Sequence, residues 1–228
     1  METKVRTRRH SPESTSRRKD EILCVASRFF AQHGYRNTDV QEIADSLGIG
    51  KGTIYRAFPT KEDLFFACVD GGMQRLTDTM QAFADRCDEQ GLTCLDRFEK
   101  AIYEFLSFYD RNEDLVELLM QERSEFKDRP THSYNRHQLQ NRERWLSRMT
   151  KAIAEGSLRP LPVEGLLEVV NDTIYGAIFT HHFSKKKMQL TTTAKLITDI
   201  LINGIISDSQ REARSVKQTN NTEESHGN

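Results

Sequence analysis

The chain has 228 residues, which is more than one typical domain and enough for a small domain joined to a larger one. It contains only 5 prolines and 12 glycines and no alternating runs of β-branched residues, so an all-α fold is predicted. No apolar stretch reaches the length of a membrane span or of a secretion signal. The four cysteines show neither CxxC pairing nor histidines at zinc-finger spacing. We expect a cytoplasmic protein with no cofactor, no metal and no membrane contact.

The formal net charge of −1 does not indicate a nucleic-acid partner, but the charge is unevenly distributed. Residues 1–19 carry seven basic side chains against two glutamates, a local net charge of +5. We expect residues 1–16 to form a disordered basic arm that suits a phosphate surface or a minor groove, although a solubilising tail has the same composition. Residues 208–228 are polar and balanced in charge, so a disordered tail is expected there.

Residues 17–62 have the pattern of a helix-turn-helix domain. A first helix from about Ser16 to His33 is predicted to end at Gly34. The next apolar side chains follow at helical spacing and indicate a short second helix, which Thr38 is expected to cap and Gly48 to end. A third helix is predicted from about Gly50 to Phe58. Two short helices joined by such a glycine-containing turn can place the second helix in the major groove of DNA.

Several segments of this domain resemble the TetR/AcrR family of bacterial transcriptional regulators. They lie within residues 17 to 66 and comprise 22–30, Gly34-Tyr35, Thr38, Ile43-Ala44, Gly48, 51–55, Phe58 and 61–65. The resemblance implies an N-terminal three-helix DNA-binding domain on a larger helical bundle. In the family this bundle dimerises and usually binds a small effector.

The resemblance also implies which residues contact DNA. Thr38 and Lys61 match family positions that contact phosphates. A second set matches positions that face the major groove or its rim: Gln41, Gly50, Lys51, Gly52, Thr53, Tyr55 and Arg56. The residue types fit, because glycine permits a close approach of the backbone and basic side chains pair with guanine or phosphate. Ala57 replaces the bulky aromatic or histidine common in the family, so one contact is expected to be weaker.

Neither a phosphate-binding loop nor a catalytic site has a sequence signature comparable to that of the helix-turn-helix. Residues 48–53 are rich in glycine and contain a lysine, but a phosphate-binding loop needs a further glycine where this chain has Asp45. No hydrophobic strand precedes the segment, and no catalytic constellation has a local signature. We therefore expect that the protein is not an enzyme.

A long helix is predicted to start at Lys61, with Thr60 as its N-cap. Gly71 and Gly72 lie inside it, and each glycine costs about 1 kcal/mol relative to alanine in a helix interior. Two interpretations are open. The helix breaks there, or the pair is a weak point in the connector through which an effector changes the separation of the DNA-binding domains.

Residues 63–207 are predicted to form the effector-binding and dimerisation domain, for a total of about nine helices. Five further helices are expected at about 92–109, 113–126, 134–154, 163–183 and 192–207. The third of these carries polar side chains between Tyr134 and Trp145, so it either stays wet or lines a cavity. The family resemblance favours the cavity, and the expected lining is Phe98, Ile102, Phe105, Glu122, His137, Gln138, Asn141 and Trp145.

The last two helices are the most apolar. They can form a simple core pair, but a four-helix bundle with a second subunit is favoured because a helix-turn-helix protein normally reads two half-sites. The expected interface is Ile174, Ala177, Ile178, His181, Ile197, Leu201, Gly204 and Ile205. His181-His182 could suggest a metal, but adjacent histidines on a helix diverge, so a surface or capping role is favoured.

The sequence as a whole predicts a homodimeric, ligand-responsive DNA-binding regulator. It is expected to repress by covering a palindromic operator on double-stranded DNA until a small-molecule effector binds. The alternatives are a TetR-like activator, a DNA binder without an effector, and a helical enzyme.

Overall fold

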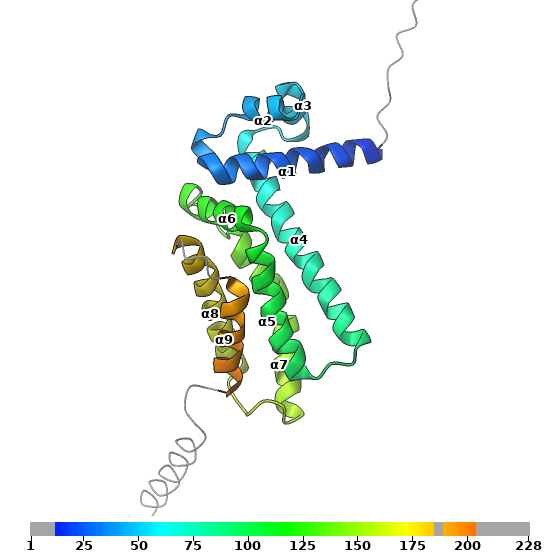
Figure 1. The fold of residues 1–228 in the computed structure, drawn as a ribbon, viewed down its shortest axis with the longest axis vertical. Coiled ribbons are helices and arrows are strands. Elements are labelled where there is room, and N and C mark those ends of the chain that lie inside the picture. The colour runs from blue at the N-terminus through cyan, green and yellow to red at the C-terminus, as the bar shows by residue number, and fades with distance from the viewer. Residues whose placement is uncertain (1–11, 185–188, 204–228) are drawn as a thin grey trace, which may run out of the picture.

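The computed structural model describes residues 12–184 and 189–203, and all the regular structure in these ranges is helical (Figure 1). The helices are α1 (Pro12–Asn37), α2 (Val40–Ser46), α3 (Lys51–Ala57), α4 (Lys61–Glu89), α5 (Cys94–Asp110), α6 (Glu113–Glu125), α7 (Ser133–Ala154), α8 (Val163–Phe183) and α9 (Leu190–Asn203). The prediction of an all-α protein with about nine helices is confirmed. Because α1 already begins at Pro12, it includes residues that were expected in the basic arm. Residues 1–11 of that arm and the predicted tail lie outside the described residues.

The first three helices form a small domain at one end of the molecule, where α1 lies across the start of α4 (Figure 1). Its centre is built from fully buried side chains of these three helices and of the start of α4, including Phe30, Ile43, Ile54 and Phe65. Ala44 is also fully buried, as expected where α2 and α3 meet. Gly34 has φ 81° and ψ 158°, so the regular part of α1 ends there as predicted.

Helix α4 joins this domain to the larger one. Thr60 and Asp63 form a reciprocal capping box at its start, which confirms Thr60 as the N-cap. The 29-residue helix then runs without interruption through Gly71 and Gly72. Of the two interpretations, the one in which the helix breaks is therefore wrong for this structure. Gly72 is buried against α6, and its lack of a side chain permits this contact, because a Cβ atom would lie 2.4 Å from Leu115 Cδ1.

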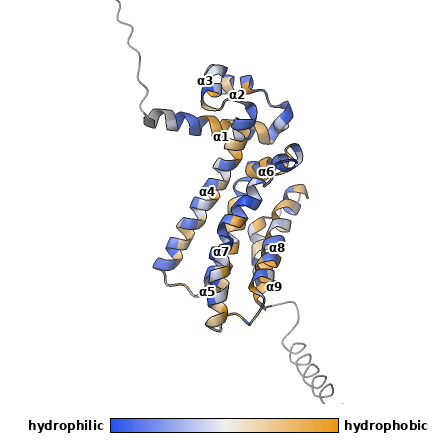
Figure 2. Ribbon diagram, turned by 180° about the vertical axis from the view of Figure 1, so that it is seen from behind, coloured by the Kyte–Doolittle hydropathy of each residue, from blue (hydrophilic) through white to orange (hydrophobic). Residues whose placement is uncertain are grey.

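Helices α5 to α9 pack with α4 as a bundle (Figure 1). Helices α8 and α9 are its most apolar members (Figure 2). None of the helices in the described ranges combines the length and apolar character of a membrane span.

The two glycines of α4 make a matched pair for a stability test. Replacing Gly72 with alanine should lower the free energy of unfolding by about 1–3 kcal/mol, because the new methyl group overpacks against Leu115. Replacing Gly71 should raise it by up to about 1 kcal/mol, since a Cβ atom there meets only two atoms, both at 3.9 Å. Chemical denaturation of both variants checks this. If both substitutions change the free energy of unfolding equally, the contact of Gly72 with Leu115 does not distinguish the two positions and the prediction is wrong.

Candidate nucleic-acid interface and effector cavity

The turn between α2 and α3 has the geometry that the sequence pattern indicates. Gly48 adopts φ 62°, a left-handed conformation that favours glycine. The Ile49 N–H donates to Ala44 O at 3.0 Å and closes the end of α2. Ile54 is fully buried and fixes α3 on the domain. The opposite face of α3 is consequently turned outward.

Thr38 lies inside the domain. Asp39, and not Thr38, is the N-cap of α2, and its carboxylate accepts a hydrogen bond from Gln41 N–H at 2.8 Å. Thr38 is only 3 % exposed, and its hydroxyl donates toward the carbonyls of Gly34 and Phe29. The capping prediction is therefore wrong, and the hydroxyl is not available to a phosphate in this structure.

The polar side chains predicted to face DNA lie on the outer face of α3 and on the neighbouring start of α2. In the free protein they have intramolecular partners. Lys51 Nζ lies 3.1 Å from Asp39 Oδ1, and Gln41 Nε2 donates to Asp45 Oδ1 at 2.7 Å. Arg56 donates to Gly52 O and Thr53 Oγ1 at 3.3 and 3.2 Å. These exposed contacts are weak, so DNA phosphates can replace them at small cost. Tyr55 is also exposed on this face.

Gly50 and Gly52 lie at the exposed start of α3. A Cβ atom at either position would meet nothing within 4 Å, and neither glycine has a positive φ. The fold itself therefore does not need glycine at these two positions. Their small size fits the close approach of an external partner to the backbone, as the predicted DNA contact requires.

Lys61 lies at the edge of the same face. Its ammonium donates to Arg36 O at 3.0 Å and stands 5.0 Å from the centre of the Tyr35 ring. Partial burial lowers the pKa of Lys61, Asp39 opposes this effect, and the positive charge of Lys51 adds to it. The contacts with Arg36 and Tyr35 hold the Lys61 ammonium near the surface that Lys51 also faces.

A cavity lies between α4, α5, α7 and α8. The centre of a water molecule can move through about 100 Å³ of it. Its walls are largely apolar and aromatic, and all the predicted pocket residues except Glu122 line it. These residues are Phe98, Ile102, Phe105, His137, Gln138, Asn141 and Trp145. Sequence reasoning missed α4 and α8 as further walls, which contribute Thr77, Met80, Leu167 and Val170 among others.

The polar groups of the cavity fall into two sets. His137 is paired with Thr77 Oγ1 at 3.3 Å, and Asn141 Nδ2 donates to His137 O at 2.9 Å. Burial lowers the pKa of His137, which favours the neutral imidazole. By contrast, Arg148 makes no ion pair with any described residue and only stacks near the Trp145 ring at 5.6 Å. Partial burial lowers the pKa of Arg148, and the nearby charges of Arg144 and Arg97 lower it further, while the negative charge of Asp88 opposes this effect.

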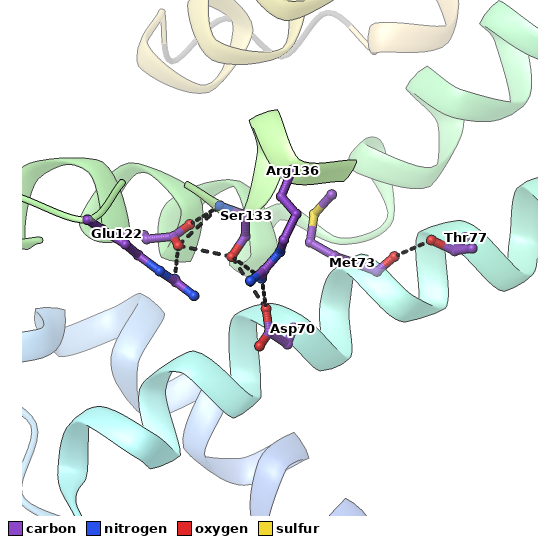
Figure 3. Close-up of polar contacts among 7 residues, drawn as sticks. Asp70, Met73, Thr77, Glu122, Ser133 and Arg136 are labelled. Atoms are coloured by element: carbon purple, nitrogen blue, oxygen red, sulfur yellow. Dashed lines mark hydrogen bonds and ion pairs between the residues drawn. The ribbon is translucent and has the colours of Figure 1, made fainter. Parts of the chain in front are cut away.

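Glu122 was predicted to line the pocket, but it lies at the junction of α6 and α7 (Figure 3). Its side chain is fully buried and accepts hydrogen bonds from Ser133 N–H, Ser133 Oγ and Arg129. Next to it, Arg136 pairs with Asp70 of α4. A buried carboxylate needs such partners, so its role here is to hold the start of α7.

Three residues of the predicted dimer interface are buried inside the protomer. Ile174, Ile178 and Ile197 are buried within the protomer and cannot contact a second subunit without unpacking it. Ala177, His181 and Leu201 are half-buried, and Gly204 and Ile205 lie outside the described residues. His182 pairs with Glu117 of α6 at 2.8 Å. The exposed apolar residues of the two helices are Val169, Phe183, Leu196, Ile200 and Ile202.

Comparison with known proteins agrees with this geometry. Residues 22–68 match the model of the family described as bacterial regulatory proteins, tetR family. The HTH-type transcriptional repressor KstR2 of Mycolicibacterium smegmatis is 24% identical over 176 residues, which cover 74% of this chain and 81% of that protein.

Solved structures share the whole fold. The ketosteroid transcriptional regulator KstR2 of Mycobacterium tuberculosis has a TM-score of 0.64 at 23% identity and covers 84% of this chain and 96% of its own. The regulator FadR of Bacillus subtilis, solved in complex with stearoyl-CoA, has a TM-score of 0.63 at 19% identity and covers 82% and 99%. Residues 22–68 thus form a DNA-binding domain of the tetR family type, and the chain as a whole is similar to transcriptional regulators.

The predicted DNA contacts can be tested on a duplex selected from a random pool with the immobilised protein. Lys51→Ala should weaken binding of the selected duplex by about 1–3 kcal/mol if the contact is specific. Lys61→Ala should weaken all duplexes alike and lower the slope of log affinity against log salt by about one unit. Lys100→Ala, on the exposed side of α5, is the control. Unchanged binding by both Lys51→Ala and Lys61→Ala would place the DNA interface elsewhere.

Proposed function

We propose that this chain is a ligand-responsive repressor that binds a palindromic operator as a homodimer and is released by a small organic effector. The observation that carries the proposal is the cavity between α4 and α7, because α4 also begins in the DNA-binding domain. A molecule that fills the cavity therefore acts on the helix that supports the helix-turn-helix. The KstR2 relative of Mycolicibacterium smegmatis is a repressor, which supports repression as the direction of the regulation.

The homodimer is proposed to form through the exposed side of α8 and α9. Leu196 is 60 % exposed, and Ile200 lies one helical turn further along the same face. Exposed apolar side chains that gather on neighbouring helices mark an interaction surface. A two-fold axis there would place two helix-turn-helix motifs on one side of the dimer. Two operator half-sites that lie about one turn of the DNA helix apart require this arrangement.

Replacing Leu196 with glutamate should convert the dimer into monomers, because it places a charge in an apolar interface. Leu139→Glu is the matched control, since Leu139 is 64 % exposed but lies on α7. Sedimentation velocity of the two variants checks the assignment, and DNA affinity should fall only for Leu196→Glu. The α8–α9 interface is contradicted if Leu196→Glu remains dimeric.

The effector is proposed to be an amphiphile with a long apolar body and an anionic head. The apolar and aromatic walls of the cavity fit such a body, and Arg148 is a half-buried cation that makes no ion pair in the described part of the chain, where Asp88 acts on it only at longer range. Arg144, which also lines the cavity, adds positive charge at the same end. The stearoyl-CoA bound by the FadR relative is a molecule of this class, which supports the proposal.

Coupling to DNA is proposed to follow from the narrowness of the cavity. Ligand sites typically enclose roughly 300–1,000 Å³, so about 100 Å³ of free space must widen to admit an amphiphile. Widening separates α4 from α7, which contact each other across the cavity through Thr77 and His137. A ligand that binds the widened arrangement more tightly shifts the position of α4 and with it the DNA-binding domains.

Hexadecanoyl-CoA is the probe that tests this proposal. It should release the selected duplex from the full-length protein in a fluorescence anisotropy assay. Arg148→Gln should bind DNA normally and need about ten-fold more probe, because a charge-assisted contact is lost. Arg86→Gln, an exposed change on α4, should respond as the wild type does. An unaltered DNA complex at saturating probe would exclude this class of effector.

A further inference from the structure

Asp39 is an acidic residue among the side chains that are expected to face DNA. Residues 39–57, which span α2, the turn and α3, contain three acidic and two basic side chains, a net charge of −1. Sequence-independent binding to DNA depends on how many phosphates the basic side chains of a protein neutralise. A helix-turn-helix with this charge balance is therefore poorly suited to sequence-independent binding.

The Asp39 carboxylate is fixed in place by its own helix. As the N-cap of α2 it accepts a hydrogen bond from Gln41 N–H at 2.8 Å, and the same oxygen, Oδ1, accepts one from Lys51 Nζ at 3.1 Å. These two bonds, the one from Gln41 first, lower the pKa of Asp39, so the group is ionised at neutral pH. Because the aspartate side chain is short, it cannot leave this position without giving up the cap.

Lys51 can keep Asp39 as a partner while it contacts a base. An ammonium group has three hydrogen-bond donors, and Asp39 takes one of them. Two donors remain for O6 and N7 of a guanine, the atoms that a lysine contacts in the major groove. Lys51 is the first residue of α3, and the N-terminal residues of a recognition helix are those that contact base edges. A base contact therefore leaves the ion pair intact.

A phosphate contact of Lys51 has the opposite consequence for Asp39. Breaking the exposed ion pair costs little by itself. A phosphate that takes the Lys51 ammonium, however, then lies next to a carboxylate that the Gln41 N–H still holds in place. Like charges placed side by side at an interface are unfavourable and discriminate against the wrong partner. Asp39 thus disfavours a contact of Lys51 with phosphate more than a contact of Lys51 with a base.

We infer that Asp39 is a specificity-determining residue, which suppresses binding to non-operator DNA by holding Lys51 away from phosphates while leaving it free to contact a guanine. This inference rests on the DNA interface proposed above, in which Lys51 contacts the operator. It assigns the discrimination between operator and other DNA in part to a carboxylate that repels the DNA backbone.

Asp39→Asn tests the inference on the full-length protein, because asparagine keeps the size and the N-cap hydrogen bond but removes the charge. Fluorescence anisotropy compares the selected duplex with a scrambled duplex of equal length and composition. Affinity for the scrambled duplex should rise about ten-fold, and its slope of log affinity against log salt should steepen by about one unit, because Lys51 is released to a phosphate. Affinity for the selected duplex should change by less than about three-fold, since the base contact of Lys51 is present in both proteins.

Two controls show whether the effect belongs to the pair of Asp39 and Lys51. Glu42→Gln removes a negative charge from an exposed position in the first turn of the same helix, and it should raise the affinity for both duplexes by no more than about two-fold. In the Lys51→Ala background, Asp39→Asn should raise the affinity for the scrambled duplex no more than Glu42→Gln does, since no lysine is left to release.

The other outcomes overturn the inference. An equal gain for both duplexes, or an equal loss of discrimination in Glu42→Gln, assigns the effect to net charge. A gain that persists without Lys51 assigns it to direct repulsion between Asp39 and DNA. If Lys51→Ala binds both duplexes as the wild type does, the proposed interface fails and the inference fails with it. If Asp39→Asn does not fold, as judged by its thermal transition, Asp39→Ser decides, because serine also supplies an N-cap oxygen.

Discussion

The buried carboxylate of Glu122 is the constraint on which the connection between the two domains depends. A charged group that is fully buried is tolerated only when its oxygens are hydrogen-bonded, and here the partners come from the start of α7 and from Arg129. The preceding residue, Gln121, donates to Phe30 O of α1 at 2.9 Å. Two adjacent residues of α6 thus hold the DNA-binding domain on one side and the cavity helix on the other.

Aromatic packing completes the same junction. The Phe126 ring, at the end of α6, lies 4.9 Å from Tyr35 and 5.5 Å from Phe65, and Arg129 stacks at 4.0 Å over Phe66. Because these rings come from both domains, the DNA-binding domain is packed on the core and is not tethered by α4 alone. A shift of α4 or α7 must therefore be transmitted through a rigid contact, which is what a regulator needs if occupancy of the cavity is to alter the spacing of two recognition helices.

Much of this architecture could be predicted from local sequence. The positions of Gly34, Gly48 and Thr60 mark helix ends because left-handed turns and caps depend on residues that are adjacent in the chain. The polar side chains of α7 left a wet helix and a cavity open as interpretations, and the family resemblance favoured the cavity. The errors have a common origin. Gly72 and Glu122 were assigned to flexibility and to the pocket, yet both are explained by residues of other helices that the local pattern does not contain.

The sequence by itself determined the helices, the helix-turn-helix and the resemblance of the N-terminal domain to the TetR family, because periodicity, caps and a short motif specify them within a few tens of residues. Only the tertiary structure decided which apolar face of α8 and α9 turns inward, because both helices carry apolar side chains on more than one side, and packing against α5 for α9 and against α6 and α7 for α8 selects among them. It also decided which polar groups of the cavity are already paired, such as Thr77 with His137. Hydrogen-bond satisfaction depends on distances between helices far apart in the chain, and those distances are set by packing.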